Sequence, residues 1–117
     1  MRELSMGEVS EVFDEWAKEM KVPTRDIIFT MSRTVANEIT IYTDRPGLMI
    51  GKAGCMIEKY KAKFNELVDK HNELIRQINM KSGREFTLSE MPYVSLNIIE
   101  VVRADYWLNY NSMGECF

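Results

Sequence analysis

The sequence predicts a two-layer α+β domain in which a three-stranded mixed sheet carries helices on one face, in the order α-β-β-α-α-β. Three observations predict this class. Apolar residues recur at helical spacing in one segment near the N-terminus and in one long central segment. Between these segments, apolar and polar residues alternate with the period of a strand. The chain has 117 residues, 45% of them hydrophobic, which is enough for one core of ordinary size, so we expect residues 1–117 to form a single domain.

The first helix is predicted over residues 6–21. Ser5 followed by Glu8 is a capping-box pattern, and Pro23 ends the helical pattern. One face of this helix is apolar, and we expect it to be buried. Its members are Val9, Val12, Phe13, Trp16 and Met20.

Two strands are predicted next. Asp26–Arg33 (DIIFTMSR) is typical of a strand, and residues 34–37 are typical of a turn. Glu38–Thr43 alternates, with Ile39 and Ile41 on one face. We expect the two strands to pair as a hairpin.

A break and a second helical region follow. Residues 45–47 (RPG) end the strand, and residues 48–50 (LMI) predict about one turn of helix. After the segment 51–54 (GKAG), a long helix is predicted through roughly six turns, with one apolar face. Its members are Ile57, Tyr60, Phe64, Leu67, Val68, His71, Leu74, Ile75 and Ile78.

The last third of the chain predicts a connection, a strand and a tail. Residues 79–92 are a polar connection with a Ser-Gly turn signal, and residues 93–102 (YVSLNIIEVV) predict the third strand. Because a helical crossover precedes this strand, we expect it to run parallel to one of the first two. The tail, residues 104–117, is aromatic, and we expect it to pack over the sheet or the first helix.

The string ITIYTDRPGLMIGKAG, residues 39–54, carries a resemblance to a known family. It joins a strand, a turn, a G-x-x-G loop and the start of a long helix, and it resembles a type II K-homology (KH) domain. The match is strongest with the KH domain found in a small-subunit ribosomal protein, and residues 96–101 (LNIIEV) add a second patch. The resemblance covers a core of about 25–103, and it implies the KH fold with a cleft for about four unpaired nucleotides.

The residues of the loop support such a cleft. Gly51 and Gly54 let a sugar–phosphate backbone approach the main chain, and Lys52 lies between them. We expect the N–H groups of residues 54–56 to face a phosphate. Leu48, Met49, Ile50 and Ile57 would form an apolar floor, and by the family's geometry the third strand and the loop with Lys81 and Arg84 would form the opposite wall. The alternative is that the glycines only shape a helix N-terminus, with Lys52 solvated.

We therefore expect a non-enzymatic protein that binds single-stranded RNA, with single-stranded DNA as the other ligand of this kind. The predicted nucleic-acid-binding residues are Arg45, Ile50, Gly51, Lys52, Ala53, Gly54, Cys55, Ile57, Lys59, Lys81 and Arg84. The net charge of −3 is unusual for such a protein, but the charges are segregated. Residues 1–20 hold six carboxylates and two cations, a local charge of −4, whereas residues 45–63 hold five cations and one carboxylate, a local charge of +4.

The acidic first helix supports an alternative function. A KH scaffold of this kind would dock on a protein or ribonucleoprotein as an interaction or inhibitor protein, as inhibitors encoded by mobile elements do. The partner-binding residues in that case would be Glu11, Glu15, Tyr106 and Trp107. Exposure of Trp107 would favour this alternative.

Other residues predict no catalytic or metal site. His71 is the only histidine, and we expect it at the rim of the core. Cys55 and Cys116 are expected to be free thiols, and neither the cysteines nor the carboxylates have the spacing of a zinc site or of a catalytic acid pair. No cofactor is expected. Because no apolar run would span a bilayer and the N-terminus lacks a signal-peptide core, we expect a cytoplasmic protein with no membrane partner.

Overall fold

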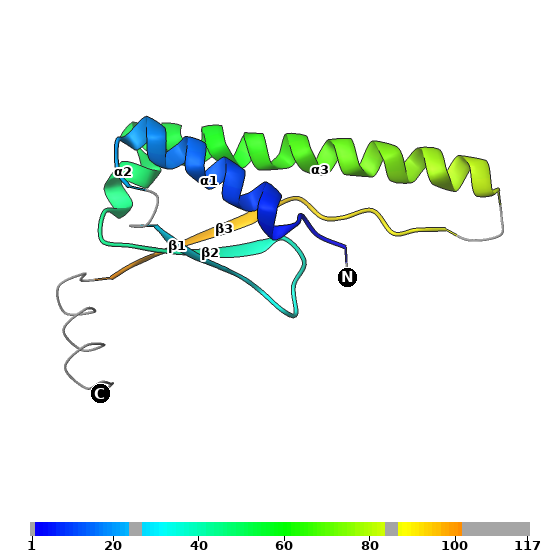
Figure 1. Ribbon diagram of the computed structural model, residues 1–117, viewed down its shortest axis with the longest axis horizontal. Coiled ribbons are helices and arrows are strands. Elements are labelled where there is room, and N and C mark those ends of the chain that lie inside the picture. The colour runs from blue at the N-terminus through cyan, green and yellow to red at the C-terminus, as the bar shows by residue number, and fades with distance from the viewer. Residues whose placement is uncertain (1, 24–26, 84–86, 102–117) are drawn as a thin grey trace.

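The computed structural model describes residues 2–23, 27–83 and 87–101, and its elements follow the expected order. The helices of the described residues all lie on one face of the sheet, which confirms the α+β two-layer prediction (Figure 1). Among the described residues, no helix is both long and apolar enough to cross a membrane. The elements are α1 (Met6–Met20), β1 (Ile28–Met31), β2 (Glu38–Thr43), α2 (Pro46–Ile50), the 3₁₀ turn η2 (Lys52–Gly54), α3 (Cys55–Ser82) and β3 (Ser95–Glu100).

The sheet is mixed, with β2 in the centre. β1 pairs antiparallel with β2, placing Phe29 opposite Ile41, and β3 pairs parallel with β2, placing Ile98 opposite Ile41. The hairpin and the parallel return across α3 were both predicted. β1 and β3 are shorter than the predicted strands, because residues 32–37 form the turn and residues 93–94 precede the ladder.

Helix α1 begins and ends as its sequence predicts. The Ser5 hydroxyl accepts a hydrogen bond from the Glu8 N–H (3.2 Å), and the Glu8 carboxylate accepts one from the Ser5 N–H (3.0 Å). Lys21 then adopts a left-handed conformation (φ 60°) and ends the helix. The side chains that α1 buries are Val9, Val12, Phe13, Trp16 and Ala17.

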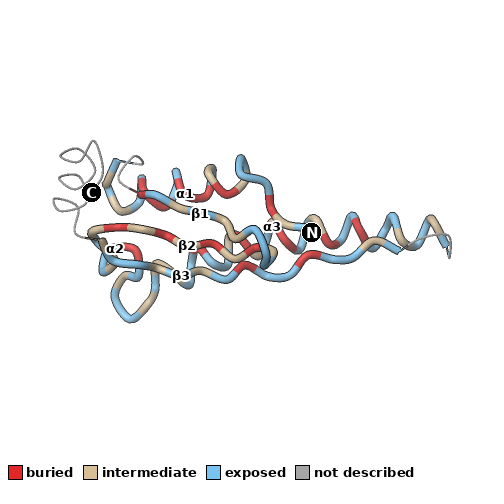
Figure 2. The backbone as a smooth tube through the Cα atoms, turned by 90° about the horizontal axis from the view of Figure 1, so that it is seen from below, coloured by how far each residue is buried: buried red, intermediate tan, exposed pale blue. Residues whose placement is uncertain are grey.

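Stacked aromatic rings form the centre of the core between α1, α3 and the sheet. The Phe13 ring stacks on Phe29 of β1 (4.7 Å between centroids), and the Trp16 ring stacks on Tyr60 of α3 (5.0 Å). Phe64 meets Phe13 edge-on (5.6 Å). Figure 2 shows the buried residues concentrated along β2 and on the inner faces of α1 and α3.

Helix α3 extends past the sheet and forms an arm with the returning chain (Figure 1). It continues to Ser82, so the expectation that the polar connection begins at residue 79 is wrong. The predicted apolar face is also wrong at its far end, because the side chains of Leu74 and Ile78 are 58% and 44% exposed. Among the described elements, neither the sheet nor α1 extends to that end of α3 (Figure 1).

Asparagines hold the returning segment against the arm. The Asn72 side chain accepts a hydrogen bond from the Met91 N–H (2.8 Å) and donates one to the Met91 carbonyl (2.9 Å). Asn79 holds Leu88 in the same way, at 2.8 and 3.0 Å. An asparagine amide thus substitutes for a neighbouring strand, since it offers one donor and one acceptor to an extended backbone.

The asparagine contacts are spaced so that the rise along helix α3 equals the rise along the extended returning segment. Asn65 accepts from the Val94 N–H (2.8 Å), so asparagines seven residues apart meet backbone groups three residues apart. Seven residues of helix rise about 10.5 Å, and three residues of extended chain span about 10 Å. The helix and the returning segment therefore stay in register along the arm.

Candidate nucleic-acid interface

The G-x-x-G segment lies where α2 ends and α3 begins. Arg45 donates its backbone N–H to the Thr43 hydroxyl (3.0 Å), which turns the chain sharply after β2, and Pro46 starts α2 at a position where no N–H donor is needed. The Gly51 N–H then bonds to the Gly47 carbonyl (2.9 Å) and closes α2. The short helix thus carries the loop out from the end of the central strand.

Gly51 cannot be replaced without local rearrangement. Its backbone (φ 77°, ψ 173°) lies in a region that only glycine occupies readily. A Cβ on Gly51 would lie 2.6 Å from the Met56 Cγ and 2.9 Å from the Met56 backbone nitrogen. Close packing of the loop against the first turn of α3 therefore requires this glycine.

The amides of the loop are arranged differently from the sequence-based expectation. The N–H of Gly54 bonds to the Gly51 carbonyl (3.1 Å) and that of Cys55 bonds to the Lys52 carbonyl, so neither is directed at a ligand. Within the described chain, the N–H groups of Lys52 and Ala53 have no backbone partner outside the turn. Within the loop 51–54, those two amides are therefore the donors open to an anion.

Lys52 is the cation of the loop itself. Its side chain is exposed and forms no ion pair with any residue in the described ranges. Ala53 beside it is also exposed and holds a positive φ of 55°, so its methyl group points to solvent in a strained turn. Cys55 is an exposed free thiol at the start of α3.

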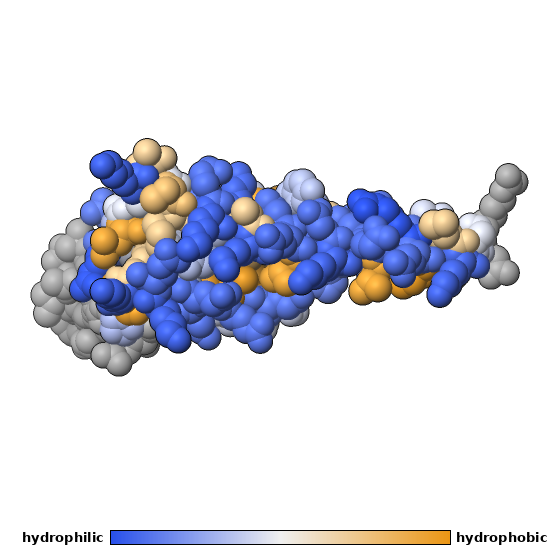
Figure 3. Space-filling model, turned by 90° about the horizontal axis from the view of Figure 1, so that it is seen from above, coloured by the Kyte–Doolittle hydropathy of each residue, from blue (hydrophilic) through white to orange (hydrophobic). Residues whose placement is uncertain are grey.

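Part of the expected apolar floor is present. Leu48 and Ile50 of α2 are 49% and 39% exposed, and hydrophobic side chains appear at this end of the molecule in Figure 3. Met49 is instead a core residue, 1% exposed, because the short helix turns that side chain inward. Ile57 is half-buried against the core.

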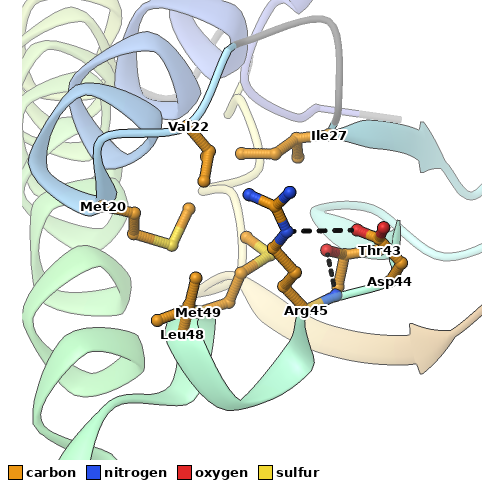
Figure 4. A pocket seen from close by; sticks show the side chains of 8 residues that line it. All are labelled: Met20, Val22, Ile27, Thr43, Asp44, Arg45, Leu48 and Met49. Atoms are coloured by element: carbon orange, nitrogen blue, oxygen red, sulfur yellow. Dashed lines mark hydrogen bonds and ion pairs between the residues drawn. The ribbon is translucent and has the colours of Figure 1, made fainter.

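Arg45 lies on the other side of α2, above a small hollow. The hollow is lined by Met20, Val22, Ile27, Leu48 and Met49 together with residues 43–45. Figure 4 shows the guanidinium of Arg45 reaching over these apolar side chains. The Nε of Arg45 lies 3.9 Å from Asp44 Oδ1. The Arg45 side chain is still half exposed, so it is available to a further anion.

Two of the cations near the loop are already paired with α1. Lys59 Nζ lies 2.8 Å from Glu19 Oε1, and Lys63 Nζ lies 3.7 Å from Glu15 Oε1. The two glutamates are four residues apart on α1, and the two lysines are four residues apart on α3. This matched spacing is the signal in the sequence that was missed. The acidic helix therefore neutralises part of the positive cluster that surrounds the loop.

Tyr60 joins the same contact. Its hydroxyl donates to Glu19 and lies 3.3 Å from the Glu15 carbonyl. The hydrogen bond from Lys59 and that from Tyr60 lower the pKa of Glu19, whereas burial and the Glu19 carboxylate raise the pKa of Tyr60. Both shifts mean that this contact favours the ionised Glu19 carboxylate and the protonated Tyr60 hydroxyl.

The remaining predicted residues are not gathered at the loop. Lys81 lies in the last turn of α3, and 26 residues of helix place it about 39 Å from Cys55, so its assignment to the opposite wall of the cleft is wrong. Glu11 is exposed on α1, whereas Glu15 is paired as described above. Arg84, Tyr106 and Trp107 lie outside the described residues.

His71 lies at the rim of the core, as predicted. Its Nε2 is 2.7 Å from Glu8 Oε2, and the imidazole is partly exposed. In the ranges that the structure describes, no three metal-ligating side chains come together.

The chain is similar to known proteins over most of its length. The family model for the KH domain matches residues 11–105. The small ribosomal subunit protein uS3 of Clostridium beijerinckii is 42% identical over 46 residues, which cover 39% of this chain and 21% of that protein. The uS3 protein of Chlamydia trachomatis is 54% identical over 33 residues, covering 28% and 15%, and that of Staphylococcus epidermidis is 39% identical over 62 residues, covering 53% and 27%. The matched region thus makes up between 15% and 27% of these relatives, and no solved structure matches significantly.

Proposed function

This chain belongs to the KH domain family, and from that premise we propose that it binds single-stranded RNA at the G-x-x-G loop. In this proposal, the backbone N–H groups of Lys52 and Ala53 and the ammonium group of Lys52 hold a phosphate. Gly51 and Gly54 allow the phosphate to approach the main chain closely, and the side chain of Ile50 supports a base. The proposed site keeps Arg45, Ala53, Cys55 and Ile57 around the loop, and it no longer includes Lys81.

The exposed, unpaired Lys52 between two glycines is the observation that carries this proposal. A glycine loop that only shaped a helix N-terminus would need neither a free cation nor apolar neighbours. The exposed Ile50 beside it supplies a surface on which a base loses little by desolvation. RNA is favoured over DNA because the matched relatives are named as ribosomal-subunit proteins.

The pairing of α1 with α3 weakens this site. Lys59 and Lys63 attract a phosphate less while Glu19 and Glu15 neutralise them. The double variant Glu15→Gln, Glu19→Gln should bind single-stranded RNA about three- to tenfold more tightly and with a steeper salt dependence, by about 0.7 per cation released. Glutamine still accepts the hydrogen bond from Tyr60, so the fold is retained.

The direct test is a fluorescence-anisotropy titration with random single-stranded RNA at two salt concentrations. A site that engages about three phosphates should give a log–log salt slope of roughly −2, and a single KH cleft should have a Kd on the order of 1 µM. The variant Lys52→Asp, Ala53→Asp should lose at least tenfold in affinity. Aspartate tolerates the positive φ of residue 53, so this variant should remain folded.

A matched control separates the loop from net charge. Arg33→Asp with Val35→Asp makes the same change in charge, on two exposed residues of the turn at the opposite end of the sheet. Equal weakening by the control variant would show that binding is non-specific. Absence of RNA binding by the wild-type protein at tens of micromolar would reject the proposal in favour of a protein or ribonucleoprotein partner. A DNA oligonucleotide of the same composition tests the preference for RNA.

A further inference from the structure

Helices α1 and α3 meet along a seam with the alternating spacing of a two-helix coiled coil. The ion pairs Glu19–Lys59, Glu15–Lys63 and Glu8–His71 show that the two helices run antiparallel. Both helices place apolar or aromatic residues along the seam at steps of three and four residues. These are residues 6, 9, 13, 16 and 20 of α1, and residues 60, 64, 67, 71, 74 and 78 of α3.

The seam of α3 is longer than its partner. α1 begins at Met6, close to the level of His71, because Glu8 already contacts that residue. Tyr60 and Phe64 are buried in the part that α1 covers, whereas Leu74 and Ile78 are 58% and 44% exposed. Figure 3 shows hydrophobic side chains along one edge of α3 beyond the end of α1.

From this overhang we infer that α3 associates with α3 of a second copy of the chain, antiparallel and about a two-fold axis near Arg76. Such an axis places Leu74 of each copy against Ile78 of the other, so the stripe is complementary to itself. In the covered half of the same seam, α3 already packs against an antiparallel helix, namely α1. The charges beside the stripe are complementary as well. In this arrangement, Lys81 of one copy lies beside the Glu8–His71 pair of the other, where its ammonium group faces the Glu8 carboxylate.

The contact is small, and the association is correspondingly weak. Two large apolar side chains per copy bury far less than the roughly 800 Å² per partner of a stable interface. We expect a dimer with a Kd on the order of 100 µM that forms and dissociates rapidly.

Sedimentation velocity of the full chain, from about tenfold below to about tenfold above that concentration, tests the inference without any RNA. The wild-type protein should shift from monomer to dimer across this range. Leu74→Lys with Ile78→Lys should stay monomeric, and so should Leu74→Glu with Ile78→Glu. An equimolar mixture of these two variants should associate more strongly than either variant alone, because antiparallel pairing sets each introduced lysine against an introduced glutamate.

Met80→Lys is the matched control. Met80 is 82% exposed on the same arm, but it lies two residues after Ile78 and so about 200° around the helix. This variant should dimerise like the wild type. A wild-type protein that remains monomeric at every concentration, or a variant mixture that associates no more than either variant alone, overturns the inference. Circular dichroism and urea unfolding confirm that each variant is folded.

A consequence of the dimer rests on the proposed function. About 21 helical residues separate each loop from the axis, so the two G-x-x-G loops would lie roughly 60 Å apart at the outer ends of the dimer. A long RNA that reaches both loops should bind more tightly than a short one, and Leu74→Lys with Ile78→Lys should remove only that difference. Failure of the sedimentation test rejects the dimer, whereas loss of short-RNA binding would reject the RNA site.

Discussion

From Cys55 to about His71, helix α3 is covered by the sheet and by α1, and its buried side chains are the aromatic or aliphatic Tyr60, Phe64 and Val68. From Asn72 to Ser82 it contacts the returning segment, and the asparagines Asn72 and Asn79 face that segment on either side of the buried Ile75. The difference follows from what each half has to satisfy. A sheet has already paired its own backbone and presents side chains to the helix, whereas a lone extended segment presents unpaired N–H and C=O groups. One helix is thus held by apolar burial at one end and by directed hydrogen bonds at the other.

The largest effect should come from the covered half. Phe64→Ala removes a fully buried ring that packs against Phe13, and it should lower the free energy of unfolding by about 3–5 kcal/mol. In a domain of ordinary stability this is a large part of the total. Urea unfolding followed by tryptophan fluorescence measures the loss. Leu67→Ala, which changes a partly exposed residue of the same helix, should cost less than half as much.

The loop at the start of α3 should show the next largest effect. Gly51→Ala creates both an unfavourable backbone conformation and a clash with Met56, and we expect a loss of about 3 kcal/mol. Gly54→Ala has the same sign of φ but meets nothing within 4 Å, so it should cost only about 1 kcal/mol. Equal losses in urea unfolding would show that packing against Met56 contributes nothing at Gly51.

The arm should respond to substitution locally. Asn72→Ala leaves the N–H and carbonyl of Met91 without partners, at a cost of about 2 kcal/mol. Because the arm projects from the core, we expect faster hydrogen exchange at residues 88–94 with little change in residues 38–43. Gln77→Ala, at an exposed position of the same arm, is the control and should change neither. Faster exchange throughout the sheet in Asn72→Ala would mean that the arm and the core unfold together.

The two halves of α3 were not equally predictable from the sequence. The capping box of α1, the strand Glu38–Thr43 and the G-x-x-G loop depend on local patterns, and the sequence predicted all three. The arm depends on contacts between segments that no local pattern reports. The predicted face included Leu74 and Ile78 because their spacing is that of a core helix, although both are exposed and no described helix or strand covers them. The recurrence of asparagine at residues 65, 72 and 79 was visible but has no meaning until the returning segment is placed beside it.

The candidate site divides in the same way. The role proposed for Lys52 follows from its place between Gly51 and Gly54, whereas the pairing of Lys59 with Glu19 joins residues 40 positions apart. Net charge near the motif therefore overestimates the free positive charge at the loop. Lys81 was misassigned because the length of α3 was underestimated by one turn and the direction of the arm is not encoded locally.

The smallest effect should appear at the boundary between the two halves, where Glu8 of α1 contacts His71. Burial alone would raise the pKa of Glu8, but hydrogen bonds from Ser5 and His71 outweigh it, and the net shift is downward. The folded protein therefore binds fewer protons at Glu8 than the unfolded chain does, so this contribution is present above the ordinary carboxyl pKa of about 4.5 and is lost as pH falls below it. Because the pair is partly exposed, the contribution should stay below about 1 kcal/mol.

Urea unfolding between neutral and acidic pH tests this contribution. The free energy of unfolding should decline less steeply for Glu8→Gln than for the wild type, since glutamine retains the capping box without titrating. Parallel declines would show that protonation of Glu8 does not change the free energy of unfolding.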